Sequence, residues 1–271
     1  MAFVTVIYNT PKSAAAFEKY YWETHVPLVG QQQAEVGFTA AELTKFDATL
    51  DGKAPTYYRQ AVLWFPSMAD LEKGIATPGF KAIGDDLANF ATGGLTALVG
   101  EQTNDASALA SGDTTAFVTV LYNTPKDAAA FEAYYAATHI PLVGAGAAEI
   151  GFSRAELARF SRNLDGSTAA FYRQAKLYFP TAAALQAGTA TAGFKAVGDD
   201  LPKFADGGLT ALGTNVLLLG IVAVWVGWAG AGLVRRFSAN VALAGAVGAD
   251  APPDVALTDT ALKALTGYQS G

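Results

Sequence analysis

Apolar residues recur along the first 100 residues with two different periods. Segments rich in β-branched and aromatic residues, bounded by glycine, proline or asparagine, predict strands at 3–8, 38–46, 57–65 and 93–99. Apolar positions three and four residues apart predict helices at 13–25, 67–73 and 78–89. Pro27 disfavours helical geometry at the residue before it, so His25 is expected in the last turn of the first helix.

The same pattern returns 114 residues later. Phe3–Lys12 is repeated almost unchanged as Phe117–Lys126, and residues 20–30 return as 134–144. Residues 3–98 align with 117–212 without a gap, and about 60 of the 96 positions are identical. A repeat of this length is a duplicated domain and not a solenoid unit.

The element order predicts an α+β fold built twice. Strand, helix, strand, strand, helix, strand gives a four-stranded antiparallel sheet with both helices on one face. The other face of each sheet must also be covered, and the second copy is the expected cover. We therefore predict a domain at 1–100, a small, acidic linker at 101–115 and a second domain at 116–213.

A different pattern follows the second copy, with an apolar segment at 214–236 and a low-complexity tail at 237–271. Val216–Val234 carries no charge, is followed by Arg235-Arg236, and reaches the lower end of the length of a bilayer span. The segment predicts either a membrane-spanning helix or an apolar helix packed on the barrel or on another subunit. Because Met1–Val6 has no signal-peptide pattern, we expect a cytoplasmic protein, with membrane association through this segment as the alternative.

Composition excludes several classes of site. The chain of 271 residues has a net charge of −6, and the pair Arg235-Arg236 is its largest basic cluster, so nucleic acid is not expected as a partner. Cysteine is absent, which removes disulfides and thiolate chemistry. With two histidines and no phosphate-binding or dinucleotide motif, the sequence predicts no metal and no cofactor.

The two histidines occupy the same repeat position. Tyr21 precedes His25 by one helical turn, and Tyr135 precedes His139 in the same way. A histidine here could act as a general acid or base or as a substrate anchor. The alternative is a histidine at the edge of the core, bonded to a backbone carbonyl. We treat His25, His139, Tyr21 and Tyr135 as candidate catalytic residues.

The third strand carries further candidates. Successive side chains of a strand point to opposite faces of the sheet. One face of this strand therefore carries Arg59, Ala61, Leu63 and Phe65, and the other carries Tyr58, Gln60, Val62 and Trp64. The Arg59 face is expected to be the helix-covered core, and the other face an interdomain surface or the wall of a polar cavity. Arg59 could bind a substrate carboxylate or pair with a nearby acid. The candidate substrate-binding residues are Trp22, Phe38, Tyr58, Arg59, Trp64, Phe152, Tyr172, Arg173 and Tyr178.

Asp85-Asp86 and Asp199-Asp200 invite a metal or paired-carboxylate interpretation. Neighbouring residues on a helix point about 100° apart, so these pairs would share a ligand poorly. We expect them to solvate or cap the helix.

The motifs resemble those of the EthD domain. The resemblance rests on the opening strand, on Tyr-Tyr-x-x-Thr-His-x-Pro-Leu-Val at 20–29 and 134–143, and on Asp-Asp-Leu-x-x-Phe-Ala-x-Gly-Gly-Leu-Thr at 85–96 and 199–210. It implies two ferredoxin-like domains paired as an intramolecular dimeric α/β barrel, and carries the family histidine to His25 and His139. Family members include a protein associated with ether degradation by a monooxygenase system, and fungal relatives act on aromatic polyketide-type compounds.

Three functions are consistent with this resemblance. The first is cofactor-independent acid/base chemistry on a small apolar or aromatic molecule, alone or within an oxidoreductase system. The second is a non-catalytic binding or accessory module for a partner enzyme. The third is a structural subunit tethered to a membrane through Val216–Val234, and further oligomerisation is compatible with each.

Overall fold

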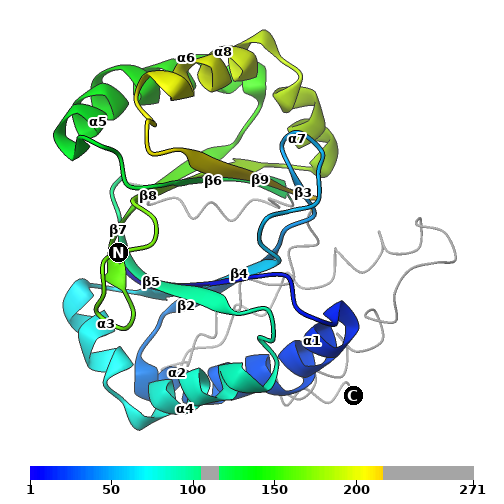
Figure 1. Cartoon of the computed structure of the whole chain (residues 1–271), viewed down its shortest axis with the longest axis vertical. Helices are drawn as coiled ribbons and strands as arrows, with labels where there is room; N and C mark the ends of the chain where they lie inside the picture. The colour runs from blue at the N-terminus through cyan, green and yellow to red at the C-terminus, as the bar shows by residue number, and fades with distance from the viewer. Residues whose placement is uncertain (105–115, 216–271) are drawn as a thin grey trace, which may run out of the picture.

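The computed structural model describes residues 1–104 and 116–215, which form two repeats of one architecture (Figure 1). The elements of the first repeat, in chain order, are β1 (Ala2–Tyr8), α1 (Ala14–Tyr20), the π-helical turn η1 (Tyr21–His25), α2 (Val26–Val36), β2 (Ala40–Lys45), β3 (Ala48–Thr49), β4 (Arg59–Phe65), α3 (Met68–Ile75), α4 (Pro78–Asp86), the 3₁₀ turn η2 (Leu87–Asn89) and β5 (Leu95–Gln102).

The second repeat follows the same order. Its elements are β6 (Ala116–Tyr122), α5 (Ala128–Tyr134), the π-helical turn η3 (Tyr135–His139), α6 (Ile140–Ile150), β7 (Arg154–Asn163), β8 (Arg173–Phe179), α7 (Ala182–Thr189), α8 (Ala192–Asp200), η4 (Leu201–Lys203) and β9 (Leu209–Asn215). β7 is one long strand where the first repeat has the shorter pair β2 and β3.

The strands form one antiparallel sheet that closes on itself. In the order β2-β4-β1-β5-β7-β8-β6-β9-β3, the two repeats meet where β5 pairs with β7 and where β3 pairs with β9. Only Phe46 and Asp47 separate β2 from β3, so the two ends of this order are joined by the chain itself. The predicted intramolecular dimeric α/β barrel is confirmed.

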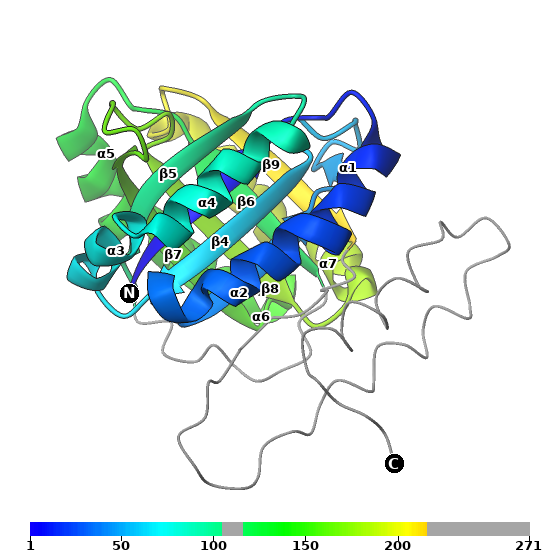
Figure 2. The same ribbon diagram turned by 90° about the horizontal axis from the view of Figure 1, so that it is seen from below.

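The helices cover the outer faces of the barrel. Figure 2 shows α1, α2 and α4 lying across the sheet of the first repeat, and Figure 1 shows α5 to α8 on the opposite side of the molecule. Leu63 and Phe65 of β4 pack with Val36, Leu71 and Ile83 under these helices. The predicted helix-covered core face of the third strand is therefore correct.

The first helix does not end at His25, contrary to the prediction. α1, η1 and α2 form one continuous helix from Ala14 to Val36, which contains Pro27. The widened turn accounts for this: the N–H of Val26 bonds to the carbonyl of Tyr21, five residues earlier. Proline normally clashes with a carbonyl four residues before it, and a π-type turn changes that spacing. His25 is thus in the middle of a helix and lies away from any helix C-terminus.

The inner face of the barrel is polar at its centre. The amide of Gln60 donates to Gln174 at 2.7 Å across the two repeats, and Lys176 is fully buried against Glu42. The hydroxyl of Tyr178 lies 3.0 Å from both Glu42 and Glu156. The predicted interdomain face of the third strand is therefore present at Gln60, Val62 and Trp64.

Tyr58 does not share that interdomain face, and here the prediction is wrong. Its ring packs on the helix side with Tyr8, Phe17 and Tyr21, and its hydroxyl donates to Glu18 of α1 at 2.6 Å. Tyr58 precedes the first residue of β4, so the alternation of the strand does not extend to it.

Two predicted segments lie wholly or mostly outside the described residues. Of the predicted linker, residues 105–115 lie outside the described residues. The first part of the predicted linker belongs to the first repeat, because β5 continues to Gln102 and the side chain of Asn104 donates to β7. The apolar segment Val216–Val234 and the tail also lie outside. Within residues 1–104 and 116–215, no helix is both long enough and apolar enough to cross a membrane.

Candidate functional site

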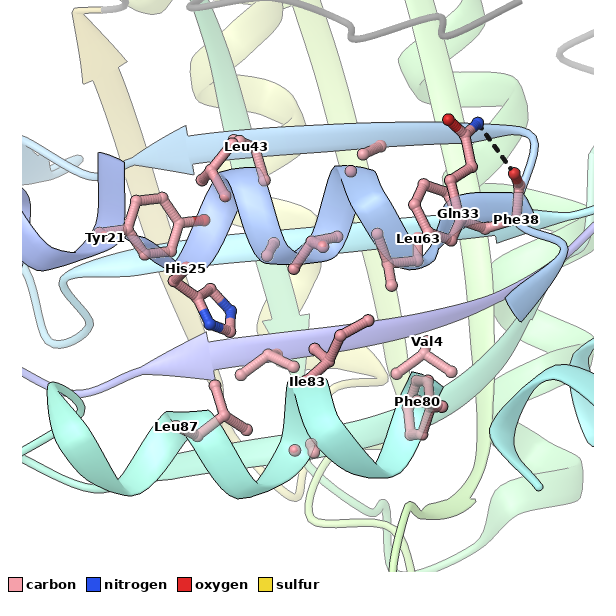
Figure 3. A pocket seen from close by; sticks show the side chains of 18 of the residues that line it. Val4, Tyr21, His25, Gln33, Phe38, Leu43, Leu63, Phe80, Ile83 and Leu87 are labelled. Atoms are coloured by element: carbon pink, nitrogen blue, oxygen red, sulfur yellow. Dashed lines mark hydrogen bonds between the residues drawn. The ribbon is translucent and has the colours of Figure 1, made fainter. Parts of the chain in front are cut away.

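A small cavity lies between the helices and the sheet of the first repeat. Its volume is about 80 Å³, and apolar side chains from β1, α2, β2, β4 and α4 form most of its lining. Figure 3 shows Tyr21 and His25 at one end of the cavity and Phe38, Phe80 and Gln33 towards the other. An apolar pocket with few polar groups is typical of a small-molecule site.

His25 brings the main polar chemistry to this cavity. The residue is 4% exposed and lines the cavity, and its Nδ1 lies 2.8 Å from Oδ2 of Asp86, the last residue of α4. A carboxylate only accepts hydrogen bonds, so Nδ1 carries the hydrogen and Nε2 keeps a lone pair. Nε2 is therefore the nitrogen available to a ligand.

Asp86 is itself held by two further donors. Its Oδ1 accepts from the hydroxyl of Tyr20 at 2.7 Å and from the amide of Asn89 at 2.9 Å. The same amide reaches the Tyr20 hydroxyl at 3.1 Å. These contacts fix the carboxylate, which in turn fixes the tautomer and the orientation of His25.

The protonation states follow from these surroundings. Burial lowers the pKa of His25, and the Asp86 carboxylate opposes that effect without overcoming it. The pKa of Asp86 is also lowered, since the hydrogen bonds from Tyr20, Asn89 and His25 outweigh its desolvation. At neutral pH the pair is therefore a neutral imidazole that donates to a carboxylate, an arrangement suited to a general base.

The tyrosines beside His25 are neutral. The Tyr21 ring stacks on the imidazole with centroids 5.7 Å apart, and burial raises the pKa of Tyr21 to about 12. Tyr8 of β1 also lines the cavity, and burial raises the pKa of its hydroxyl well above the usual value. Both can donate a hydrogen bond to a ligand, but neither forms a phenolate near neutral pH.

The second repeat carries the same pair. His139 Nδ1 lies 2.9 Å from Asp200 Oδ2, and Oδ1 of Asp200 accepts from the hydroxyl of Tyr134 at 2.8 Å. Tyr135 stacks on His139 with centroids 5.5 Å apart. Burial raises the pKa of Tyr135 to about 12 and lowers the pKa of His139.

Asp86 and Asp200 bond to the two histidines, whereas the sequence analysis expected them to solvate or cap the helix. Asp85 does have that role, since it is exposed and pairs with Lys81. Asp86 lies three residues after the buried Ile83 and so shares its inward face of α4. That spacing is the signal in the sequence that distinguishes Asp86 from Asp85.

One wall of the first cavity comes from the other repeat. Leu164, just after β7, lines the cavity, and its backbone N–H bonds to Ala97 of β5 at 2.9 Å. Arg162 fixes the same segment by an ion pair with Glu72 of α3 at 2.7 Å. The site in the first repeat is thus completed by the second.

Arg59 and Tyr58 lie together, and both donate to a carboxylate of the protein itself, that of Glu18. The guanidinium of Arg59 forms a two-pronged ion pair with Glu18, which also accepts from Tyr58 and from the indole of Trp22. The ion-pair alternative for Arg59 is therefore the one present. Arg173 and Tyr172 repeat the arrangement on Glu132.

The remaining predicted substrate-binding residues divide between two faces of the sheet. Phe38 lines the cavity with His25, and its counterpart Phe152 packs at the same place in the core of the second repeat. Trp64 and Tyr178 lie inside the barrel, on the opposite face of the sheet from His25. The structure does not bring these two to the histidines.

Comparison with known proteins identifies the family of this chain. The family model described as the EthD domain matches twice, at residues 9–94 and 123–208, and both matches contain the histidine and its aspartate. The chain belongs to the EthD family. A similar protein, the uncharacterized 11.0 kDa protein in the thcB-thcC intergenic region of Rhodococcus erythropolis, is 40% identical over 95 residues, which cover 35% of this chain and 88% of that protein.

The chain is also similar to proteins of known structure. An anthrone oxidase-like protein is 18% identical, covers 80% of this chain and 91% of its own, and superposes with a TM-score of 0.52, which shows a shared fold. An ethyl tert-butyl ether d (EthD) family protein from Bacillus halodurans is 25% identical, covering 38% of this chain and 99% of that one, with a TM-score of 0.34. A second family model, the cobalt uptake substrate-specific transmembrane region, matches residues 203–258.

Proposed function

We propose that this EthD protein moves a proton on a small, mostly apolar molecule bound beside His25. The observation that carries the proposal is the His25–Asp86 pair at the end of an apolar cavity, with Nδ1 bonded at 2.8 Å. Nε2 of neutral His25 accepts a proton from an acidic C–H or O–H of the ligand, and Asp86 stabilises the imidazolium that forms. His139 and Asp200 supply the same chemistry in the second repeat.

The substrate class follows from the cavity. Its lining offers the ligand the imidazole and the hydroxyls of Tyr8 and Tyr21 among apolar side chains, so a charged substrate would lose its hydration without a counter-ion there. We propose a small aromatic or ether compound, handled alone or beside a partner oxidoreductase. The names of similar proteins, which refer to ethyl tert-butyl ether and to anthrone oxidation, support this class.

The test uses the full chain and its two histidines. Small phenols, aromatic ketones and alkyl ethers are first screened for binding by thermal shift, and binders are then assayed for product and for deuterium exchange by NMR. The double variant His25→Gln/His139→Gln is expected to lose about 10²–10⁴-fold in rate. An unchanged rate in a folded double variant would remove the proton-transfer role.

A non-catalytic binding module is the second candidate, favoured by a cavity lining that is almost entirely apolar. It predicts that a ligand raises the melting temperature while no product forms and no deuterium is exchanged. Product formed by the purified protein excludes it.

We also retain as proposals the predictions on the tail. Anchoring or subunit docking through Val216–Val234 would bring the barrel to a membrane or to a partner enzyme. Fractionation of the full chain against a chain ending at Asn215 distinguishes a tethered from a free barrel.

A further inference from the structure

The two histidine–aspartate pairs differ at one charged neighbour. In the first repeat, Oδ1 of Asp86 accepts from the neutral amide of Asn89 at 2.9 Å. The aligned residue in the second repeat is Lys203, whose Nζ lies 3.1 Å from Oδ1 of Asp200. The same carboxylate position is therefore contacted by a dipole in one repeat and by a full positive charge in the other.

The rest of each surrounding is closely matched. Both imidazoles are 4% exposed, and their distances to the carboxylate are 2.8 and 2.9 Å. Phe90 and Phe204 pack on the two rings with centroids 4.6 and 4.7 Å away. The exposure and packing of the two rings are therefore alike. The carboxylates differ in exposure, 11% for the Asp86 side chain and 3% for Asp200, and in the charge that contacts them, which only Lys203 supplies.

The other ionisable groups around each pair are also equivalent in the two repeats. Three tyrosines lie near the pair in the first repeat: Tyr8 on β1, and Tyr20 and Tyr21 on the helix. Their equivalents in the second repeat are Tyr122, Tyr134 and Tyr135. Arg59 and Arg173 lie 5.0 and 4.9 Å from the rings of Tyr21 and Tyr135.

The charged side chains that differ between the repeats near these helices are exposed. Lys19 and Glu23 of the first repeat are replaced by alanine in the second, and Thr92 is replaced by Asp206. Exposed charges of this kind are screened by water and salt, whereas Lys203 contacts the nearly buried Asp200 directly.

We infer that Lys203 is a positioning residue that makes His139 a weaker base than His25, so that the two repeats of one chain work over different ranges of pH. An imidazolium at His139 is stabilised by the Asp200 carboxylate, and Lys203 already neutralises much of that charge. At His25 the Asp86 carboxylate keeps its full charge, because Asn89 adds none. The catalytic consequence rests on the proposed proton-transfer function, whereas the difference in basicity does not.

NMR titration of the imidazoles tests the inference without a substrate. The chain has two histidines in all, so His25→Gln and His139→Gln assign each signal in the intact protein. His139 is expected to titrate about half a pH unit below His25, the shift given by one added charge at several ångströms in a water-like dielectric. Raising the salt concentration should narrow the gap.

Reciprocal exchanges at the differing position provide the matched controls. Lys203→Asn should raise the titration midpoint of His139 towards that of His25, and Asn89→Lys should lower the midpoint of His25, with the other histidine unmoved in each case. Lys203 is an exposed side chain, so both variants are expected to fold. Equal midpoints in the wild type, or a His139 midpoint unmoved by Lys203→Asn, would overturn the inference even if catalysis by the histidines were proven.

Discussion

At the scale of single residues, the site depends on a carboxylate that is nearly buried and fully bonded. Asp86 accepts from His25, Tyr20 and Asn89, and its side chain is 11% exposed. Its neighbour Asp85 is 66% exposed and pairs with Lys81 one turn away. Adjacent aspartates on one helix thus have different energetic roles, which makes them a matched pair for mutation.

Asp86→Asn is expected to destabilise the protein by about 1–3 kcal/mol, because charge-assisted bonds from the buried His25 and from Tyr20 are weakened. Asp85→Asn is expected to stay within about 0.5 kcal/mol, as for other exposed ion pairs. Chemical denaturation of both variants measures the difference. If the two changes cost the same, Asp86 does not have the structural role assigned to it.

The histidines and their repeat position could be predicted from the sequence, but their partners could not. Asp86 was visible as a candidate, yet its orientation depends on the register of α4 against α2, which a motif of two adjacent acids does not reveal. The sequence predicted that Arg59 could pair with an acid, but not which one. Glu18 could be identified as the partner only from the packing of α1 on β4.

At the scale of the elements, one widened turn determines where the histidine lies. η1 continues α1 into α2 through Pro27, so the sequence signal for a helix end was wrong, and α2 itself was not predicted. The turn occurs at the same place in the second repeat, where the N–H of Ile140 bonds to the carbonyl of Tyr135. π-helical turns are often found at functional sites, and the two turns here end at His25 and His139.

The packing of α3 against the end of α2 gives a prediction at this scale. A Cβ added to Gly74 of α3 would overlap the carbonyl oxygen of Val36 and lie 2.8 Å from the Phe65 ring. Gly74→Ala is therefore expected to destabilise the protein by about 1–3 kcal/mol through overpacking.

Gly84→Ala on α4 is the control for this change, since no atom lies within 4 Å of the added Cβ. Higher helix propensity should make this variant more stable than the wild type by up to about 1 kcal/mol. Thermal denaturation of both variants checks the pair. A Gly74→Ala protein as stable as Gly84→Ala would contradict the close approach of α3 to α2.

At the scale of the whole molecule, the repeat in the sequence predicted the closed barrel, because each open sheet face needed a cover. The contents of the interior were not predictable, since they depend on which side chains of the two repeats face each other. Glu42 comes from one repeat, and Lys176, Tyr178 and Glu156 from the other. A tyrosine hydroxyl has one hydrogen to donate, so its contacts with two carboxyl groups require one of them to be protonated.

Glu156 is the protonated partner. Burial and the nearby Glu42 carboxylate raise the pKa of Glu156 to about 7. A carboxyl group with a raised pKa in the folded state contributes stability at low pH, which is lost as the pH rises from about 4.5 towards 7.

Glu156→Gln cannot ionise, so its stability relative to the wild type should increase by up to about 3 kcal/mol between pH 5 and pH 8. Urea denaturation at the two pH values measures this change. A difference between variant and wild type that does not depend on pH would show that Glu156 is ionised throughout.

The contribution of one repeat to the cavity of the other gives a last prediction. Leu164→Ala should enlarge the cavity beside His25 and allow larger aromatic ligands to bind, with a loss of about 1–3 kcal/mol in stability. The aligned Leu50 is 38% exposed, so Leu50→Ala is the milder control. Thermal-shift titration with a series of aromatic compounds distinguishes the two variants, and identical profiles would show that Leu164 does not limit the space.

The joining of both halves of the barrel in one polypeptide has a consequence for its interior. A barrel made from two identical subunits contains every buried ionisable group twice, so its count is always even. Here the aligned partners of Lys176 and Tyr178 are Val62 and Trp64. On the inner face of the barrel, within the residues that the structure describes, three acids and bases are at least nine-tenths buried: Glu42, Glu156 and Lys176. Two identical subunits could not contain an odd number of such groups. Because the two halves differ in sequence, a single ammonium pairs with Glu42, and one tyrosine hydroxyl links Glu42 to Glu156.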